Sequence, residues 1–127
     1  MWSREEKLEF MAKMEGRTAD FAVAVFRCLN ALPLSVSSKV IAFQLGKSAS
    51  SIGANYREAN RSESSDDFIH KIGIVLKECS ETRYWLELLQ KLYPAEAAFA
   101  DLTKECEEIV RIFQSIRTTM YRKRNAS

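Results

Sequence analysis

The chain has 127 residues, of which 46% are hydrophobic and 28% are charged, and its formal net charge is +2 at pH 7. This length suits one domain with a real core, and the composition excludes wholesale disorder. The mild positive charge permits contact with nucleic acid without requiring it. Only four glycines and two prolines occur, so few turns and many helix-forming residues favour an all-α fold.

The cysteines indicate neither a disulfide framework nor a zinc site. Cys28, Cys79 and Cys106 lie far apart on predicted apolar stripes, and no Cys-x-x-Cys pair occurs. No apolar run approaches the length of a membrane span, and no secretion signal is recognisable. We therefore expect a cytoplasmic protein that has no membrane partner.

The N-terminal segment, residues 1–16, is rich in charge and has a helical pattern. It is expected either to form a separate arm or to run into the next helix despite Gly16. Thr18 is the predicted N-cap of that next helix, and an apolar stripe follows over residues 21–32 at helical spacing. Pro33 is expected to end the helix, because a proline disfavours the α conformation in the residue before it.

The second predicted helix begins near the serines at positions 35, 37 and 38, any of which can cap it. Its apolar stripe begins with Val36 and Val40 and continues to Ala59. Gly46 and Gly53 lie within this stripe, although each glycine costs a helix about 1 kcal/mol relative to alanine. We therefore predict that another helix approaches closely at these glycines.

An acidic, serine-rich break over residues 61–67 separates the second and third predicted helices. Ser64 and Asp67 have the spacing of a capping box. The apolar stripe of the third helix is broadened by Ile69, Trp85 and Leu92 beyond the width that one neighbouring helix pair needs. This excess predicts self-association, because a large exposed apolar patch rarely serves a monomer.

The dipeptide Tyr93-Pro94 ends the third predicted helix, and Pro94 is predicted at the first position of the fourth helix. The fourth helix carries an apolar stripe over residues 99–120, and the basic tail, residues 121–127, is expected to fray. We therefore predict an all-α, up-down-up-down antiparallel four-helix bundle, formed by a single domain of residues 1–127.

No catalytic or metal-binding apparatus is recognisable in the sequence. His70 is the only histidine, whereas a di-iron bundle needs two Glu-x-x-His pairs. No glycine-rich phosphate loop or dinucleotide fingerprint occurs either. We expect His70 to be a surface residue and the protein to be non-enzymatic, with no cofactor and no metal.

Four polar residues are set one helical turn apart within the second and third helices: Asn55 with Glu58, and Glu78 with Glu81. One interpretation is ion pairing along exposed helix faces, for example between Lys77 and Glu81, at a few tenths of a kcal/mol per pair. The other is a buried polar network that fixes the register of the helices or a subunit interface. Both remain open at this point.

No acidic residue follows Glu108, so the C-terminal end of the chain is basic. Cations near a helix C-terminus stabilise the helix by themselves, and the alternative is contact with nucleic acid or an acidic partner. The candidate nucleic-acid-binding residues come from this end and from the second and third helices. They are Lys47, Arg57, Arg61, Lys71, Arg117, Arg122, Lys123 and Arg124.

The second and third helices also carry a family pattern. Residues 44–52 read Gln-Leu-x-Lys-Ser-Ala-x-Ser-Ile and are followed by Asn55 and Glu58, while residues 77–86 read Lys-Glu-x-x-Glu-Thr-x-Tyr-Trp-Leu. The chain here resembles the four-helix bundle family named after the 23S ribosomal RNA intervening sequences in which some members are encoded. The resemblance covers about residues 18–120. Gly46 departs from the pattern, since a larger residue is common there.

The resemblance implies a four-helix bundle that assembles into a ring-like homopentamer. The chain is also similar to the accessory proteins of diversity-generating retroelements, which are basic pentameric bundles that work with a reverse transcriptase and its RNA. We therefore expect a non-enzymatic homopentamer that binds RNA or other nucleic acid, including DNA, through the basic residues named above. The alternative is a protein–protein adaptor or accessory subunit, for example to a reverse transcriptase, with no direct nucleic-acid role.

Overall fold

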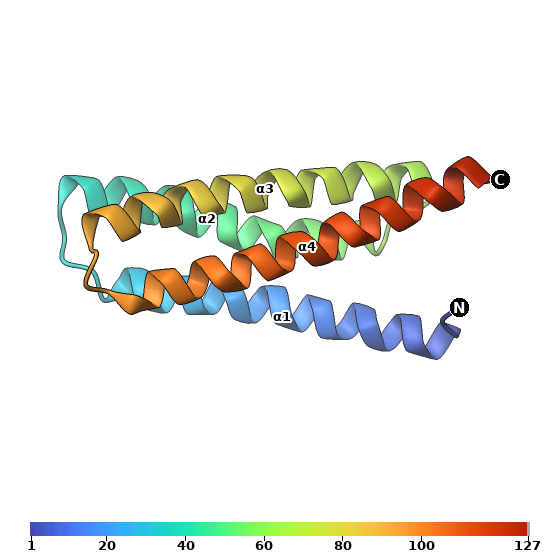
Figure 1. Cartoon of the computed structure of the whole chain (residues 1–127), viewed down its shortest axis with the longest axis horizontal. Coiled ribbons are helices and arrows are strands. Elements are labelled where there is room, and N and C mark those ends of the chain that lie inside the picture. Colours follow the sequence, from blue (N-terminus) through green and yellow to red (C-terminus); the bar gives the residue numbers. More distant parts are fainter. Residues whose placement is uncertain (127) are drawn as a thin grey trace.

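The computed structural model describes residues 1–126, which fold into four helices joined by short loops (Figure 1). The helices are α1 (Arg4–Asn30), α2 (Val36–Ala59), α3 (Ser65–Leu92) and α4 (Ala97–Ala126). Consecutive helices run antiparallel, and both chain ends lie at the same end of the bundle. The described residues contain no strand. The predicted up-down-up-down bundle is confirmed.

Serine caps begin the two central helices. Ser35 precedes α2, where its side chain accepts a hydrogen bond from Ser38 N at 3.0 Å and Ser38 Oγ accepts one from Ser35 N at 2.9 Å. Ser64 precedes α3 and accepts a hydrogen bond from Asp67 N at 3.0 Å. These bonds satisfy backbone groups that the first helical turn leaves without partners. The predicted serine caps are confirmed, but the predicted capping box at Ser64 is only half formed, because among the described residues the Asp67 side chain makes no bond to Ser64 N.

The first helix is continuous from Arg4 to Asn30, so the N-terminal segment extends α1 through Gly16. Ser3 and Glu6 form a reciprocal capping box at its start. The prediction of Thr18 as an N-cap is therefore wrong. Thr18 is fully buried inside the helix, where its hydroxyl bonds back to the Met14 carbonyl oxygen at 2.9 Å.

The prediction about the start of α4 is also wrong. Pro94 does not begin the helix, because Glu96 N donates to the Tyr93 carbonyl oxygen at 3.0 Å and Pro94 occupies the second position of this turn, where proline is favoured. The helix α4 continues to Ala126, and fraying of the basic tail stays a prediction. Arg124 lies over the Tyr121 ring at 4.8 Å within these last turns of the helix. Ser127 lies outside the described residues.

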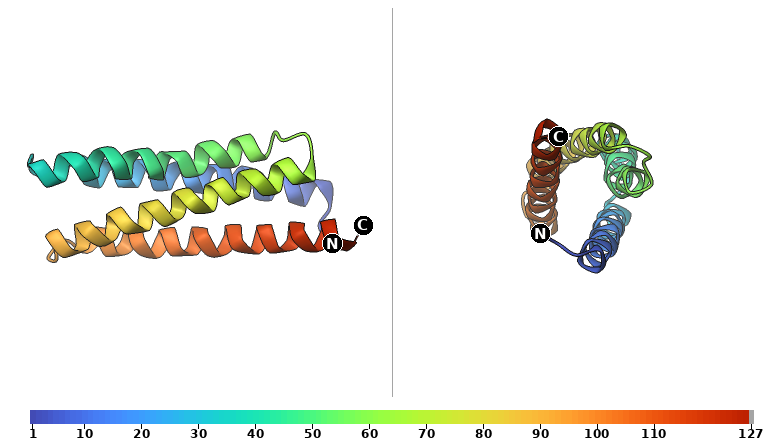
Figure 2. Two further views of the ribbon diagram at one scale, coloured as in Figure 1. Left: turned by 90° about the horizontal axis from the view of Figure 1, so that it is seen from above. Right: turned by 90° about the vertical axis from the view of Figure 1, so that its right-hand side faces the viewer.

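The core runs along the centre of the bundle and takes apolar side chains from all four helices, which surround it in the end-on view of Figure 2. Tyr56 of α2 and Phe113 of α4 meet there edge to face, with ring centroids 5.0 Å apart. Val36 and Val40 depart from the predicted stripe, because they are 85% and 53% exposed and Ile41 takes the core position in that turn.

Both glycines of α2 face side chains of α1 at close range. A Cβ atom added to Gly46 would lie 2.8 Å from Phe26 Cε1, and one added to Gly53 would lie 3.0 Å from Thr18 Oγ1. Such distances leave no room for a methyl group unless the neighbour moves. The predicted close approach of another helix backbone is confirmed at Gly53, where the added Cβ would lie 3.6 Å from the Thr18 carbonyl carbon, whereas Gly46 makes room for the Phe26 ring. These contacts explain why helix-weakening residues occur in the middle of α2.

Candidate nucleic-acid interface

Most of the candidate basic residues lie in the half of the bundle that carries the two chain ends. The end of α2, the start of α3 and the last turns of α4 meet there (Figure 1). The residues that this arrangement brings to one end are Arg57, Arg61, Lys71, Arg117, Arg122, Lys123 and Arg124. Lys47 is separate from them, because the twelve helical steps from it to Ala59 span about 18 Å.

Three of these basic side chains contact carboxylates of a neighbouring helix. The pairs are Arg57 with Glu15 at 4.0 Å, Lys71 with Glu58 at 3.8 Å and Arg124 with Asp66 at 3.1 Å. Each pair lowers the local positive potential that a phosphate would meet. Pairs on the surface are weak, however, so a phosphate can compete with the carboxylate for the cation.

The other candidates differ in exposure. Lys47, Arg61 and Arg122 are exposed, while Arg117 is half-buried. Lys123 is exposed and also lines a cavity between α1 and α4. Phosphate contact requires an accessible guanidinium or ammonium group. Arg61 and Arg122 are therefore the candidates best placed to meet a nucleic acid at this end.

The four residues of the proposed polar network lie along the α2–α3 side of the bundle. Asn55 Nδ2 donates to the Ser51 carbonyl oxygen at 2.8 Å, within its own helix. Among the described residues, no hydrogen bond joins any two members of the four. Glu58 instead pairs with Lys71 of the neighbouring helix at 3.8 Å, and the pair of Lys77 with Glu81 that the ion-pair interpretation names is not formed among the described residues.

Glu78 has the most perturbed environment of these four. Its burial raises the pKa of the carboxyl group, and the negative charge of Glu81 raises it further, while Lys77 and Lys47 act in the opposite direction. The charge of Lys47 on α2 therefore acts on the Glu78 carboxyl group of α3 across the contact between the two helices. The cost of charging Glu78 falls when a cation or a hydrogen-bond donor approaches it.

Two polar contacts that tie helices together are missing from the sequence-based predictions. Thr82 Oγ1 and Ser48 Oγ lie 2.9 Å apart between α3 and α2, and both residues are buried. Small polar residues within two apolar stripes are the signal that could have indicated this contact. Nothing in either stripe, however, fixes which serine meets which threonine.

The second missed contact is a bidentate ion pair between α1 and α4. Arg17 Nε and Nη2 donate to the two carboxylate oxygens of Glu105 at 2.8 and 2.6 Å, and Nη2 also reaches Glu108 at 2.6 Å. The hydrogen bonds from Arg17 lower the pKa of Glu105. Charged residues are frequent on both helices, so the sequence does not single out this trio.

The histidine and the cysteines are placed as the sequence suggests. His70 is exposed. Cys79 and Cys106 are fully buried. The pKa of the Cys79 thiol is raised, mainly by a hydrogen bond with the Cys106 side chain and secondly by burial, and this disfavours the reactive thiolate. Within residues 1–126, no three His, Cys, Asp or Glu side chains gather in a way that could hold a metal ion. No helix in that range is long and apolar enough to cross a membrane.

The fold and these contacts define an all-α four-helix bundle with seven of the eight candidate basic residues at one end. The family model of the 23S rRNA-intervening sequence protein matches residues 11–115, and the chain belongs to this family. The resemblance drawn from the sequence is thereby confirmed.

Among solved structures, one similar chain is a protein of unknown function from the S23 ribosomal protein family of Bacteroides thetaiotaomicron VPI-5482. It is 36% identical to this chain with a TM-score of 0.71, and the alignment covers 82% of this chain and 97% of the other. No curated protein matches the chain.

Proposed function

We propose that this protein is a non-enzymatic bundle that assembles into a ring of five copies and binds RNA, or another structured nucleic acid, through its basic end. The single observation that carries the proposal is the gathering of basic residues from α2, α3 and α4 at the end that holds the chain termini (Figure 1). The number of copies rests on the family resemblance.

Symmetry would strengthen a patch that is weak in one copy. The net charge of a single chain is only +2. In a cyclic assembly whose axis runs along the bundles, every copy presents the same end to the same side of the ring. The basic ends then form one continuous surface, and several weak phosphate contacts act together.

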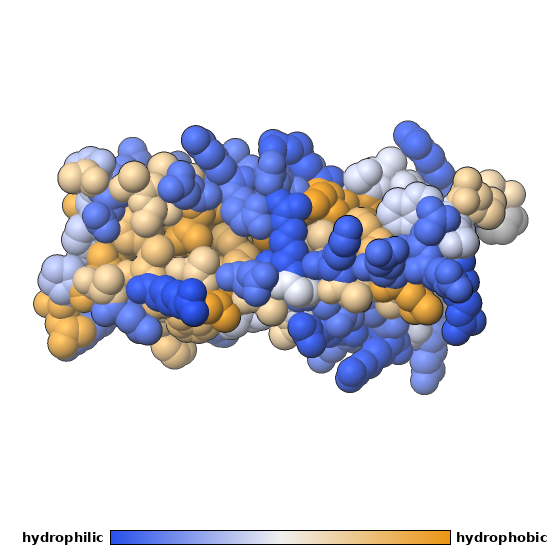
Figure 3. Space-filling view, turned by 90° about the horizontal axis from the view of Figure 1, so that it is seen from below, coloured by the Kyte–Doolittle hydropathy of each residue, from blue (hydrophilic) through white to orange (hydrophobic). Residues whose placement is uncertain are grey.

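An exposed apolar patch on α1 and α2 supports self-association. Its members are Val23, Phe26, Leu34, Val36, Val40 and Phe43, each between 43% and 86% exposed. Phe26 lies against Gly46, one helical turn from Phe43, so the two helices contribute to one surface. Viewed from the side of α1, hydrophobic residues gather toward the end opposite the chain termini (Figure 3). A patch of this kind is typical of an interface.

The sequence-based argument for self-association relied on the third helix, and the structure changes that basis. Ile69 is buried and Trp85 is half-buried, so neither adds to an exposed patch, whereas Leu92 is 50% exposed. The exposed apolar surface lies instead mainly on α1 and α2. The expectation of an oligomer thus stays a proposal with a different supporting surface.

A salt-titrated binding assay with a labelled RNA hairpin tests the nucleic-acid role. The double variant R61Q/R122Q removes two exposed cations at the basic end, and K39Q/K91Q removes two exposed cations at the opposite end. We expect R61Q/R122Q to weaken binding and to reduce the slope of log K against log salt by about one per lost phosphate contact. K39Q/K91Q should leave the slope unchanged. Equal effects of the two variants, or no binding at low salt, would contradict the proposal.

The alternative is an adaptor or accessory subunit whose partner is a polypeptide, for example a reverse transcriptase. The observation that favours it is the pairing of three candidate cations with carboxylates, together with the exposed apolar patch. A protein partner that stays bound after nuclease treatment, and that is lost in F43S, would support this role over direct nucleic-acid binding.

A further inference from the structure

A cavity of about 780 Å³ lies between α1 and α4 at the end of the bundle that carries the termini. The two helices diverge toward this end, and the residues before α1 lead across the opening toward α4 (Figures 1 and 2). Buried Tyr56 and half-buried Phe68 contribute to the lining from α2 and α3. The divergence of α1 from α4 over an otherwise packed core thus leaves a space that no side chain of residues 1–126 fills.

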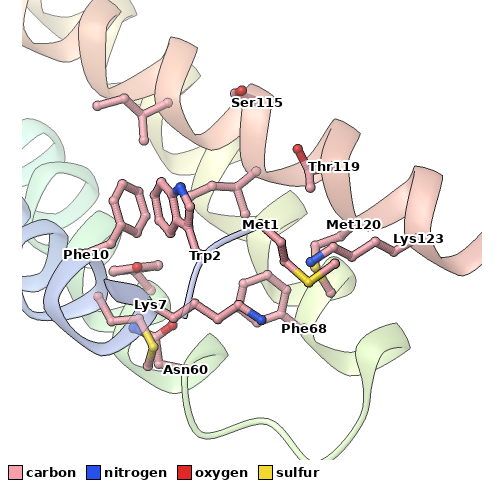
Figure 4. Close-up of a pocket in the computed structure, with 14 residues that line it drawn as sticks. Met1, Trp2, Lys7, Phe10, Asn60, Phe68, Ser115, Thr119, Met120 and Lys123 are labelled. Atoms are coloured by element: carbon pink, nitrogen blue, oxygen red, sulfur yellow. The ribbon is translucent and has the colours of Figure 1, made fainter. Parts of the chain in front are cut away.

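Apolar side chains make up most of the cavity wall. Phe10 and Trp2 form a tilted aromatic pair with ring centroids 5.1 Å apart, and Figure 4 shows both rings facing the space in front of α4. Ile112 and Ile116 line it from α4 itself. The volume lies within the range of small-molecule sites, which are about 300–1,000 Å³ and mostly apolar.

The inner polar groups of the cavity already have partners within the chain. Asn60 Nδ2 donates to Glu15 Oε2 at 3.0 Å, and burial raises the pKa of the Tyr56 hydroxyl while the neighbouring Asn60 side chain opposes this shift. These groups offer little to a ligand that must be read by several hydrogen bonds, such as a nucleobase. The inner wall instead suits a hydrocarbon, which needs only dispersion contacts and removal from water.

The charge of the cavity has one sign. Among the fourteen described residues that line it, two are lysines, Lys7 and Lys123, and none is acidic. Figure 4 shows the Lys7 and Lys123 side chains approaching Phe68 from α1 and α4 respectively. An anionic group held between these two ammonium groups would have its hydrocarbon part directed toward the apolar wall.

We propose that this cavity binds a single-chain fatty carboxylate, with the hydrocarbon tail among the aromatic and aliphatic side chains and the carboxylate between Lys7 and Lys123. A peptide helix from another chain is a poorer match, because the segment before α1 leads across the opening. The site shares Lys123 with the proposed nucleic-acid interface, whereas Lys7 and the apolar wall belong to the cavity alone.

Calorimetric titration of the full-length protein with octanoate, decanoate and dodecanoate, each below its micelle concentration, tests the tail. Each added pair of methylenes should tighten Kd by roughly tenfold until the cavity is full. Decanol should bind more weakly than decanoate, and decyltrimethylammonium more weakly still, because the lysines favour an anion. An affinity that does not depend on chain length, or equal binding of the cation, would overturn the proposal.

Substitutions at the lysines test the head group. K7Q/K123Q should weaken decanoate binding about tenfold while leaving decanol binding unchanged. The matched control K13Q/K104Q changes exposed lysines on the same two helices that do not line the cavity and should alter neither ligand. A loss that is equal for decanoate and decanol would show a change of structure and would count against the proposed site.

A substitution that fills the cavity gives an independent measurement. Ser115 is an exposed residue that lines the cavity, whereas its neighbour Gln114 is exposed and does not line it. S115W should abolish decanoate binding, and Q114W should preserve it, with circular dichroism confirming the helix content of both. Retention of binding in a folded S115W protein would overturn the proposal. If S115W does not fold, the lysine pair still decides the question.

Discussion

Thr82 Oγ1 and Ser48 Oγ lie 2.9 Å apart in the contact between α3 and α2, where both residues are buried. Thr82 also bonds the Glu78 carbonyl oxygen at 2.8 Å, and Ser48 bonds the Leu45 carbonyl oxygen at 3.3 Å. Each hydroxyl thus has a partner in its own helix and one in the next. This pair fixes the lengthwise register of α2 against α3, because a slip of either helix would leave each buried hydroxyl with only the carbonyl oxygen of its own helix.

The substitution T82V should lower the free energy of unfolding by about 1–2 kcal/mol, because valine keeps the shape and leaves the buried Ser48 hydroxyl with a poorer partner. T82V/S48A should cost less than the sum of the two single changes, since no lone hydroxyl then remains. Urea unfolding of the four proteins in this cycle measures the coupling. T118V, at an exposed position of α4, is the control, and a zero coupling energy would contradict the role in register.

The ion pair between Arg17 and Glu105 predicts a pH-dependent contribution to stability. Arg17 lowers the pKa of Glu105 in the folded protein, so the contribution is present above the unfolded carboxyl pKa and is lost as pH falls through the folded value. R17Q should therefore cost about 0.5–1 kcal/mol at about pH 7, a modest value because both side chains are partly exposed.

The measurement is urea unfolding of R17Q and the original protein at neutral pH and at about pH 3. The difference in unfolding free energy should shrink toward zero at the acidic pH, where the carboxylates become protonated. E107Q, at an exposed position next to this cluster, should show no such change. A difference that is constant with pH would mean that Arg17 contributes through packing of its aliphatic part.

Local sequence rules predicted the helices well, because their signals lie within a few residues of one another. The caps at Ser35 and Ser64 and the core stripes needed only the spacing of adjacent residues. The same rules gave wrong helix starts at Thr18 and Pro94. A threonine can cap a helix, or its hydroxyl can bond back to a carbonyl inside the helix, as Thr18 does. A proline can begin a helix or lie in the turn before it, as Pro94 does. In both cases the surrounding structure decides which of the two arrangements forms.

The candidate site was less predictable because it depends on how the helices cross. The topology alone brings Arg61 and Arg122 to one end of the bundle, since they lie at the C-terminal ends of α2 and α4, and these two helices run in the same direction when consecutive helices are antiparallel. The pairing of Arg57 with Glu15, however, needs the rotation of α2 about its axis relative to α1. The cavity beside Lys7 needs the divergence of α1 from α4. Periodicity within one helix contains no information on either angle.

The glycines of the chain predict opposite effects for the same substitution. A Cβ at Gly53 would meet Thr18 Oγ1 at 3.0 Å and Thr18 Cβ at 3.3 Å, and Thr18 is buried and cannot move aside. A Cβ at Gly16 or Gly73 would meet nothing within 4 Å. G53A should therefore destabilise the protein by about 1–3 kcal/mol, whereas G16A and G73A should stabilise it by up to about 1 kcal/mol each.

Thermal unfolding of these three variants under the same conditions is sufficient to check the prediction. The proteins differ from the original chain by the same single methyl group, so hydrophobicity and helix propensity change alike in all three. Only the space around the new methyl differs. A stabilised G53A would show that α1 and α2 can separate at Thr18 without cost, which the observed contact excludes.

The exposed apolar patch of α1 and α2 predicts which face mediates self-association. Phe43 is 69% exposed, so F43S should leave the fold and the melting temperature of the isolated bundle nearly unchanged. If the patch is the contact between copies, F43S should shift sedimentation toward the monomer at concentrations where the original protein is oligomeric, since a buried phenylalanine contributes about 1.5–3 kcal/mol per interface. The control is Y84S, which removes an aromatic ring that is 52% exposed on α3, outside the patch. An oligomer that resists F43S but dissociates in Y84S would place the contact on the α3 side of the bundle.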